Sequence, residues 1–321
     1  MYTLNDIRKF AWQLGFEKDC YRAYCEGYEK LDNLGLYTTL NWAAKGICDG
    51  RFDGMEAVEK VLSPVYELSG LHKYTVDGLA ITLAFMYLRD KYKENGLPDD
   101  LFWDTAKDIV WKSNECHKVE KVWGSSVGLW YHIFFRLTGF CFGRFQYETI
   151  PFPIERLRFE NVYCEGPRGS AVFHDYDFCV TIHIPSSGVP ITDEVRMDSY
   201  KKAHAFYASQ FSGGVVPFTC ASWLLFPQNR EILPEKSNVL RFMDDFVIVK
   251  HEVDNRFYDG WRIFGCGLGT PLEEYPRETS MQKAYYEWLK SGKKCGSGCG
   301  IFLFDGEKIY NKPSEIVVKK K

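Results

Sequence analysis

The sequence predicts an α+β protein, in which an all-helical N-terminal domain precedes a mixed, mostly antiparallel sheet flanked by helices. Up to about residue 120, apolar side chains recur at every third or fourth position, which is typical of amphipathic helices. From Phe140 onward they alternate with polar side chains, as in strands with one buried face. The chain has 321 residues, which suits two domains. We therefore expect one domain at residues 1–124 and a second at residues 125–321.

Three helices are the clearest elements of the first domain. One is expected over residues 75–96, because this segment begins at a threonine that can cap a helix and stops at Gly96. An amphipathic pattern predicts the next helix over residues 99–115. A strongly apolar helix over residues 125–137 is expected to lead into the second domain.

The second domain is expected to begin with an antiparallel meander and to continue with helices and strands in alternation. Its residue pattern predicts meander strands at residues 141–152, 154–166 and 171–185. After the meander, the pattern predicts a helix over 193–211, a strand over 219–225, a helical turn near 228–232, a hairpin of strands at 246–253 and 261–264, a helix near 279–291 and a Gly-rich final strand.

Composition and charge narrow the possible partners. The net charge is −3 and no long basic stripe is present, so nucleic acid is not expected as a partner. No run approaches the ~20 apolar residues of a membrane-spanning helix, and the polar start of the chain does not resemble a signal peptide. Several of the 11 cysteines lie in apolar segments, where a thiol behaves as a small hydrophobe. These features predict a cytoplasmic protein with reduced thiols.

The connection between the strand that ends at Pro185 and the helix expected from residue 193 is the most informative part of the chain. Ser186, Ser187 and Gly188 form a polar loop, and Thr192 stands where a helix N-cap is expected. Such a connection aims free backbone N–H groups and the positive end of a helix dipole at one point, where a phosphate group can bind. An ordinary strand-to-helix turn needs the same residue types, so both interpretations stay open.

Five sequence blocks carry a resemblance to a known family. They are FGRFQYE at residues 142–148, VTIHIP at 180–185, CASWLL at 220–225, SNVLRF at 237–242 and TSMQKA at 279–284. In this order they resemble the signature blocks of bacterial acyltransferase domain-containing proteins, in which a helical N-terminal domain precedes a GNAT-like (N-acetyltransferase) C-terminal domain. The resemblance implies a GNAT-like fold and the transfer of an acyl group from acyl-CoA to an amine of a small molecule or peptide.

The resemblance also implies where the acyl-CoA lies. In GNAT-type enzymes the fourth strand follows the pantetheine arm, and the loop after it wraps the pyrophosphate. Here these elements correspond to residues 179–184 and 185–192. The neighbouring strand at 219–225 is expected to splay away and leave a slot for the thioester. The implied cofactor-binding residues are Ile184, Ser186, Ser187, Gly188, Thr192 and Trp223.

Acyl transfer to an amine needs a base, a donor for the oxyanion and an acid for the leaving thiolate. His183, at the exit of the implied cofactor strand, is the candidate base. Glu148 follows a run of aromatic residues that can raise its pKa. Ser222 is a candidate hydrogen-bond donor, and Tyr207 is a candidate acid. Structural alternatives stay open for three of them. His183 can be a half-buried histidine on a strand face, Glu148 can form a salt bridge at the rim, and Tyr207 can lie on the buried face of its helix.

Two departures from the family pattern keep a non-catalytic function open. Phe226 stands where family members often carry an acid, and the loop at 185–192 lacks the Arg/Gln-x-x-Gly-x-Gly/Ala fingerprint of GNAT enzymes. Residues 262–267, RIFGCG, match that fingerprint by letter but are expected to follow a hairpin strand. A GNAT-like protein that binds a ligand or a partner without turnover would fit both departures.

A serine hydrolase is a third possibility. The segment GSSVG at 124–128 matches the G-x-S-x-G nucleophile elbow, with Ser126 as nucleophile, between segments that can form a strand and a helix. The region before it, however, lacks the β-α alternation of a hydrolase sheet. No metal site is expected, because neither the C-x3-C pair at Cys295 nor the C-x4-C pair at Cys20 has a histidine pair nearby.

Overall fold

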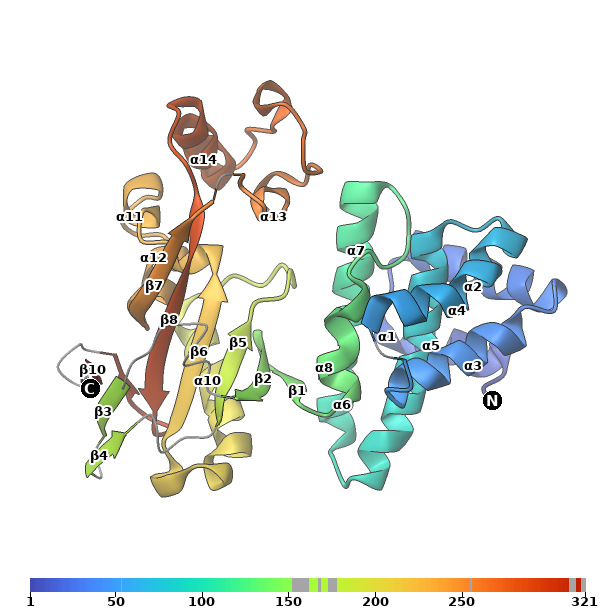
Figure 1. Cartoon of the computed structure of the whole chain (residues 1–321), viewed down its shortest axis with the longest axis horizontal. Coiled ribbons are helices and arrows are strands. Elements are labelled where there is room, and N and C mark those ends of the chain that lie inside the picture. Colours follow the sequence, from blue (N-terminus) through green and yellow to red (C-terminus); the bar gives the residue numbers. More distant parts are fainter. Residues whose placement is uncertain are drawn as a thin grey trace. The chain divides into compact units, whose positions relative to one another are not determined.

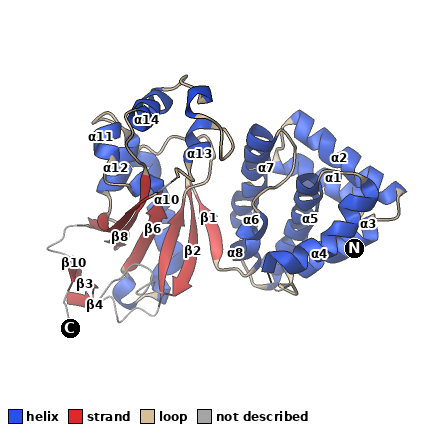
Figure 2. Ribbon diagram, turned by 45° about the horizontal axis from the view of Figure 1, so that its top comes forward, coloured by secondary structure: helices blue, strands red, loops and turns tan. Residues whose placement is uncertain are grey.

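The computed structural model divides the chain into two compact units (Figure 1). The first consists of Met1–Cys141 with Pro185–Ser187, and the second of Phe142–Ile184 with Gly188–Lys321. Strands begin only at Gly139, and helices alone precede them (Figure 2). The structure describes residues 1–52, 54–151, 162–166, 169–172, 178–254, 256–311 and 316–318.

The first unit is a helical bundle around α5. Its helices are α1 (Leu4–Leu14), α2 (Lys18–Asn33), α3 (Tyr37–Cys48), α4 (Gly54–Ser69), α5 (Lys73–Glu94), α6 (Asp99–Ala106), α7 (Asp108–Glu120) and α8 (His132–Phe135), with a 3₁₀ turn at Gly128–Tyr131. Helix α5 buries residues on nearly every side, including Leu79, Leu83 and Leu88, as expected for a helix at the centre of a bundle. None of the described helices is long and apolar enough to cross a membrane.

The structure moves or divides the three helices that the pattern predicts. The helix expected from residue 75 begins at Lys73, because Nδ1 of His72 accepts a hydrogen bond from the Tyr74 N–H and acts as the cap. The helix expected over 99–115 is instead the two helices α6 and α7. The helix expected over 125–137 is reduced to the 3₁₀ turn and α8. Hydrophobic periodicity locates helices well and their ends poorly.

The second unit is built on a mixed sheet with the strand order β1-β2-β5-β6-β8-β7, in which β9 also pairs with β8. These strands are β1 (Gly139–Phe142), β2 (Phe145–Pro151), β5 (Phe178–His183), β6 (Val216–Ser222), β7 (Val247–Val253), β8 (Gly296–Phe304) and β9 (Ile309–Tyr310). Strands β5 and β6 are parallel, whereas the pairs β2–β5, β6–β8, β7–β8 and β8–β9 are antiparallel. A separate three-stranded sheet has the order β10-β3-β4, formed by β3 (Val162–Gly166), β4 (Gly169–Val172) and β10 (Ile316–Val318). The predicted α+β class is confirmed.

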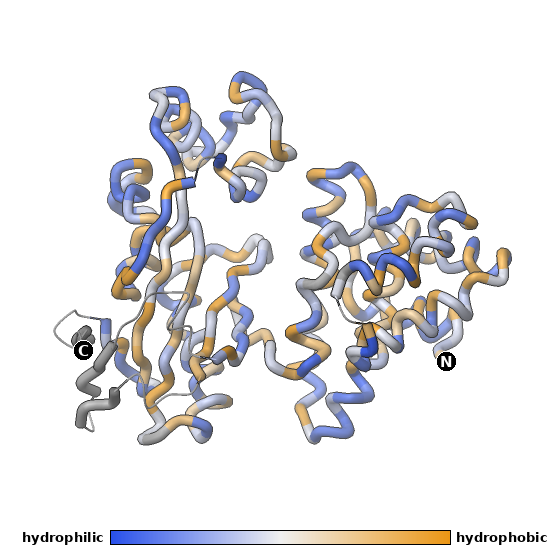
Figure 3. Tube along the Cα trace, in the orientation of Figure 1, coloured by the Kyte–Doolittle hydropathy of each residue, from blue (hydrophilic) through white to orange (hydrophobic). Residues whose placement is uncertain are grey.

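Helix α10 (Asp193–Tyr207) connects the parallel strands and packs on an aromatic face of the sheet. The ring of Tyr200 lies 5.8 Å from that of Phe145 and 5.1 Å from that of Phe302, and Tyr147 lies 5.6 Å from Phe218. This layer forms the core of the unit, and hydrophobic residues follow strands β6 and β8 through it (Figure 3). The remaining helices are α11 (Asn229–Ile232), α12 (Asn238–Asp244), α13 (Gly260–Phe264) and α14 (Ser280–Lys290).

Two strand predictions in this unit are wrong. Residues 261–264 belong to helix α13, and β7 pairs with β8 instead of with them. Ile263 and Phe264 are both buried, which adjacent residues of a half-buried strand cannot be. The segment at 141–152 is two strands, because the chain reverses at Gly143, whose φ of +64° favours glycine.

Two further strand predictions are altered. The strand expected over 219–225 ends at Ser222, and Trp223–Leu225 form a 3₁₀ turn. Most of the strand expected over 154–166 lies outside the described residues, and its end forms β3 of the three-stranded sheet.

Glycines alternate on β8 at positions where neighbouring atoms lie too close for a side chain. A Cβ atom on Gly298 would lie 2.1 Å from the carbonyl oxygen of Leu225, and one on Gly296 would lie 2.0 Å from that of Glu252. A Cβ atom on Gly300 would lie 2.8 Å from the Cβ atom of Phe246. The turn after β6 therefore occupies the space that a side chain at Gly298 would otherwise fill.

Candidate active site

The parallel strands β5 and β6 separate at their carboxyl ends. Their ladder consists, among the described residues, of the pairs Val180–Phe218 and Thr181–Thr219. Strand β5 continues to His183, while β6 continues to Ser222 and remains paired with β8. Parallel strands end at the same edge of a sheet, and the pairing described between these two strands stops at Thr181 and Thr219. We call the space between their last residues the opening. The short ladder is consistent with the splay expected from the family resemblance.

His183 and Glu148 form a pair at the edge of this opening. The Nε2 atom of His183 lies 3.0 Å from Oε2 of Glu148, which is a hydrogen-bond distance. His183 pairs with Gln146 in the ladder and Glu148 pairs with Thr181, so the two side chains project from the same face as diagonal neighbours. The His183 side chain is 27% exposed and that of Glu148 is 17% exposed, so both are accessible to a substrate.

The face that carries this pair is polar, whereas the face beneath α10 is aromatic. Thr181 and Thr219 lie on the polar face, and so does Cys179, whose Sγ is 3.5 Å from Oγ1 of Thr219. Burial raises the pKa of the Cys179 thiol to about 12, so this cysteine is protonated near neutral pH and is not a nucleophile. Neither threonine was expected at the site, although Thr181 precedes His183 by two residues and therefore shares its face.

Tyr207 and Ser222 lie on the aromatic side of the sheet. The buried hydroxyl group of Tyr207 donates a hydrogen bond to the carbonyl oxygen of Tyr147 at 3.2 Å. Ser222 shares a face with Phe218, and its Oγ accepts a hydrogen bond from the N–H of Leu224 as the cap of the 3₁₀ turn. The structure does not bring these two hydroxyl groups to His183, and their catalytic roles stay predictions.

At the end of β6, Trp223 is half-buried and Phe226 is buried. The ring of Trp223 lies 5.8 Å from that of Tyr285 in α14. Phe226 is buried, and a Cβ atom on Gly296 would lie 2.8 Å from its ring. A carboxylate in this position would lose its hydration without a charged partner, so Phe226 suits its surroundings as a core residue.

The loop between β5 and α10 ends in a capped helix start. Oγ1 of Thr192 accepts a hydrogen bond from the N–H of Val195 at 3.4 Å, which confirms the predicted N-cap. Gly188 has a φ of +76°, in the left-handed region that favours glycine. Nε of Arg144, in the turn before β2, donates a hydrogen bond to the carbonyl oxygen of Val189 at 2.7 Å.

The remaining loop residues are accessible to different degrees. Ser186 is exposed, while Ser187 and Ile184 are half-buried. Asp193 and Glu194 occupy the first turn of α10, where their negative charge offsets the attraction of the helix dipole for an anion. A phosphate at this loop would therefore depend on backbone N–H groups more than on the dipole.

The structure does not provide the setting of a hydrolase nucleophile around Ser126. Residues 121–127 are an irregular segment after α7, and a 3₁₀ turn follows them, so this described segment contains no strand. A nucleophile elbow requires a strand before the serine and a helix after it. The RIFGCG segment at 262–267 likewise covers the end of α13 and the αL residue Gly265, instead of opening a helix.

Comparison with known proteins accounts for both halves of the chain. Residues 5–137 match the model of an N-acyltransferase N-terminal domain, and residues 140–302 match that of a GNAT-like C-terminal domain. None of the curated proteins matches the chain.

Several solved structures have the same fold as this chain. One is an acyltransferase in complex with decanoyl-CoA, with 20% identity, a TM-score of 0.70 and coverage of 92% of this chain and 87% of that chain. An acyltransferase mutant in complex with octanoyl-CoA has 18% identity and a TM-score of 0.68, at the same coverage. An acyltransferase in complex with decanoyl-CoA and teicoplanin has 17% identity and a TM-score of 0.66, again at the same coverage.

Proposed function

We propose an acyl-transfer function for this chain. It belongs to the family of proteins with a GNAT-like C-terminal domain, and an N-acyltransferase N-terminal domain precedes that domain here. The acyl group would pass from acyl-CoA to an amine of a small molecule or peptide. The single observation that carries this proposal is the His183–Glu148 pair at the opening between β5 and β6. The complexes of similar proteins with decanoyl-CoA and octanoyl-CoA support the donor, and the complex with teicoplanin supports an acceptor.

In the proposed reaction, His183 is the base. If Nε2 donates its proton to Glu148, the other ring nitrogen, Nδ1, carries the lone pair that accepts a proton from the amine. The amine nitrogen then forms a bond to the thioester carbon, and the carbonyl oxygen becomes an oxyanion. As this intermediate collapses, the C–S bond breaks and the imidazolium returns its proton to the leaving thiolate. The products are an amide and free CoA, with the histidine in its starting state.

Glu148 has two roles in this scheme. Its carboxylate fixes which ring nitrogen of His183 carries the proton, and its negative charge stabilises the imidazolium that forms. The loop at residues 185–192 would bind the pyrophosphate of CoA through backbone N–H groups. Gly188 suits this task because its positive φ would strain the backbone of any other residue there.

Calorimetric titration with CoA and decanoyl-CoA, followed by a thiol-release assay with amine acceptors, tests the proposal. Micromolar binding together with amine-dependent release of CoA is expected. Binding without release would favour the non-catalytic GNAT-like protein, which the buried Phe226 also favours. The absence of binding at millimolar ligand would overturn both. We further propose a cytoplasmic location, because ten of the eleven cysteines are free thiols.

A further inference from the structure

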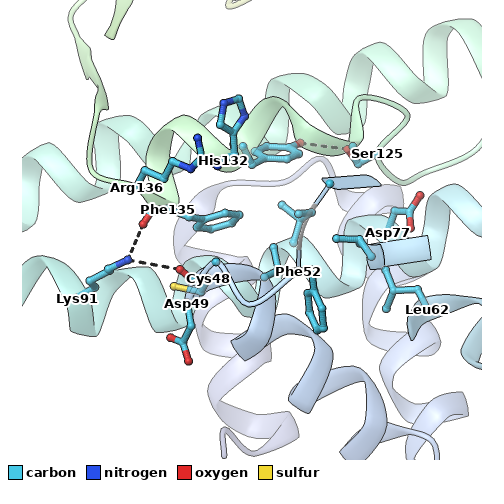
Figure 4. A pocket seen from close by; sticks show the side chains of 17 residues that line it. Cys48, Asp49, Phe52, Leu62, Asp77, Lys91, Ser125, His132, Phe135 and Arg136 are labelled. Carbon is cyan, nitrogen blue, oxygen red and sulfur yellow. Dashed lines mark hydrogen bonds between the residues drawn. The ribbon is translucent and has the colours of Figure 1, made fainter. Parts of the chain in front are cut away.

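The helical unit contains a cavity that plays no part in the proposed acyl transfer. Its volume is about 350 Å³, and it lies among α3, α4, α5 and the segment that includes α8 (Figure 4). Small-molecule sites in proteins typically have volumes of roughly 300–1,000 Å³, so this cavity can hold a small ligand. Its walls are largely apolar and include Phe52, Leu62, Ile81 and Phe135.

One wall of the cavity depends on a glycine. A Cβ atom on Gly46 of α3 would lie 2.6 Å from two ring atoms of Phe52, so the ring would have to shift if any side chain stood there. The ring of Phe52 therefore rests directly on the backbone of α3. On the opposite wall, Phe135 is buried and packs edge to face on Phe85 of α5, with ring centres 5.2 Å apart. The backbone of α3 thus supports the ring of Phe52, and Phe85 supports the ring of Phe135.

Asp77 introduces an uncompensated charge into this apolar wall. It lies on α5, is half-buried and accepts no hydrogen bond from any residue in the described ranges. Burial raises the pKa of its carboxyl group to about 7, and the nearby Glu59 acts in the same direction. Lys73 partly counteracts this, but its ammonium group is paired with Glu59. A positively charged ligand would offset the free-energy cost of burying this carboxylate.

Lys91 and Asp49, on the other side of the cavity, already have partners. Figure 4 shows Lys91 and Asp77 at opposite sides, with Phe52 and Phe135 between them. Nζ of Lys91 donates a hydrogen bond to the carbonyl oxygen of Phe135 at 2.6 Å. The Asp49 carboxylate on that side is paired with Lys45 and Arg51. The lining carboxylate that still needs a cation is therefore Asp77.

We infer that this cavity binds an aliphatic amine, with the ammonium group against Asp77 and the alkyl body between Phe52 and Phe135. The inference concerns a second site and does not depend on acyl transfer. A carboxylate ligand is the main alternative, since the exposed side chains of His132 and Arg136 lie at the rim.

Three ligands with eight carbon atoms each, tested on the wild-type protein, distinguish an amine site from an anion site and from an apolar cavity. n-Octylamine, octanoate and 1-octanol are titrated by calorimetry near pH 7.5. The amine is expected to bind about tenfold or more tightly than either of the others, because a charge-assisted hydrogen bond is worth more than a neutral one. Equal binding of 1-octanol would mean an apolar cavity without charge recognition, and tighter binding of octanoate would mean an anion site. Either result overturns the inference.

Substitutions then locate the ammonium group. Asp77→Asn keeps the volume and is expected to weaken octylamine about tenfold or more, with little effect on 1-octanol. Glu94→Gln removes an exposed carboxylate from the same helix and is expected to leave all three affinities unchanged. An equal loss in both variants would overturn the site. A CoA titration of each variant reports on the proposed function separately, so a failure of either proposal is recognised on its own.

Discussion

The imidazole of His183 lies 3.0 Å from the carboxylate of Glu148, because the β2–β5 register makes them diagonal neighbours on one face. His183→Gln keeps a polar side chain but removes the base, so kcat for acyl transfer is expected to fall about 100- to 10,000-fold. The Kd for acyl-CoA, measured by calorimetry, should change little. His251→Gln, an exposed histidine of β7, is the control and should retain full activity. Normal turnover in His183→Gln would remove this residue from the mechanism.

Glu148→Gln tests whether the charge of the partner matters. The amide can still accept a hydrogen bond, but it neither fixes the tautomer of His183 nor stabilises the imidazolium. We expect kcat to fall about tenfold or more while KM for acyl-CoA stays within a factor of about three. A steady-state assay over several acyl-CoA concentrations separates these two quantities. An unchanged kcat would reduce Glu148 to a structural partner.

Gly188→Val tests the proposed pyrophosphate loop. Gly188 and Gly292 have φ values of +76° and +79°, and a Cβ atom on either glycine would meet no other atom within 4 Å. A valine at either place therefore imposes a similar backbone strain, of about 1–2 kcal/mol. Only Gly188→Val is expected to weaken CoA binding, by about tenfold. Equal Kd values for the two variants would move the CoA site away from this loop.

Asp245→Ala is expected to destabilise the second unit strongly. Arg196 and Asp245 form a two-bonded ion pair at 2.7 and 3.2 Å, and their side chains are only 6% and 14% exposed. Removing Asp245 leaves the buried Arg196 with Asp193 as its remaining carboxylate partner, so the free energy of unfolding is expected to fall by about 3 kcal/mol, near the lower end for a broken buried pair. The neighbouring Asp244→Ala breaks an exposed pair with Arg230 and should cost about 1 kcal/mol or less. Urea denaturation followed by fluorescence compares the two.

Asp77 makes the stability of the helical unit depend on pH. Its pKa in the folded chain, about 7, lies above the ordinary value of 3.8, so the folded state binds more protons between these pH values. The free energy of unfolding should therefore fall as pH rises from about 4 to about 7. Lys73, Glu59 and Cys116 are the titratable groups that interact with it. Asp77→Asn should flatten this part of the profile in thermal melts, and identical profiles would contradict the shifted pKa.

The sequence predicts the α+β class because the change from helical to strand periodicity is a local property. It also singles out His183 and Glu148 by residue type and position in their strands. Their contact depends on the register of β2 against β5, which no local pattern encodes. The hydrogen bond from Tyr207 to the Tyr147 carbonyl oxygen, on the aromatic side of the sheet, has the same origin, since the face that a side chain takes follows from strand and helix packing.

The incorrect strand at residues 261–264 shows a different limit. Trp261, Ile263 and Phe264 have high β-propensity, yet they form a single helical turn that ends at Gly265. A segment this short carries too little periodicity to distinguish a helix from a strand. Tertiary packing, through the burial of two adjacent side chains, decides the outcome.

The alternating glycines of β8, at residues 296, 298 and 300, affect how well the chain tolerates mutation. The large side chains of the strand are those of Ile301, Phe302, Leu303 and Phe304. At these positions one apolar side chain can often replace another with a small loss of stability. At Gly296 and Gly298 even alanine would have to displace a carbonyl oxygen of the opposing backbone. In a saturation library across β8, the fewest substitutions should therefore give folded protein at Gly296 and Gly298, where the strand has no side chain.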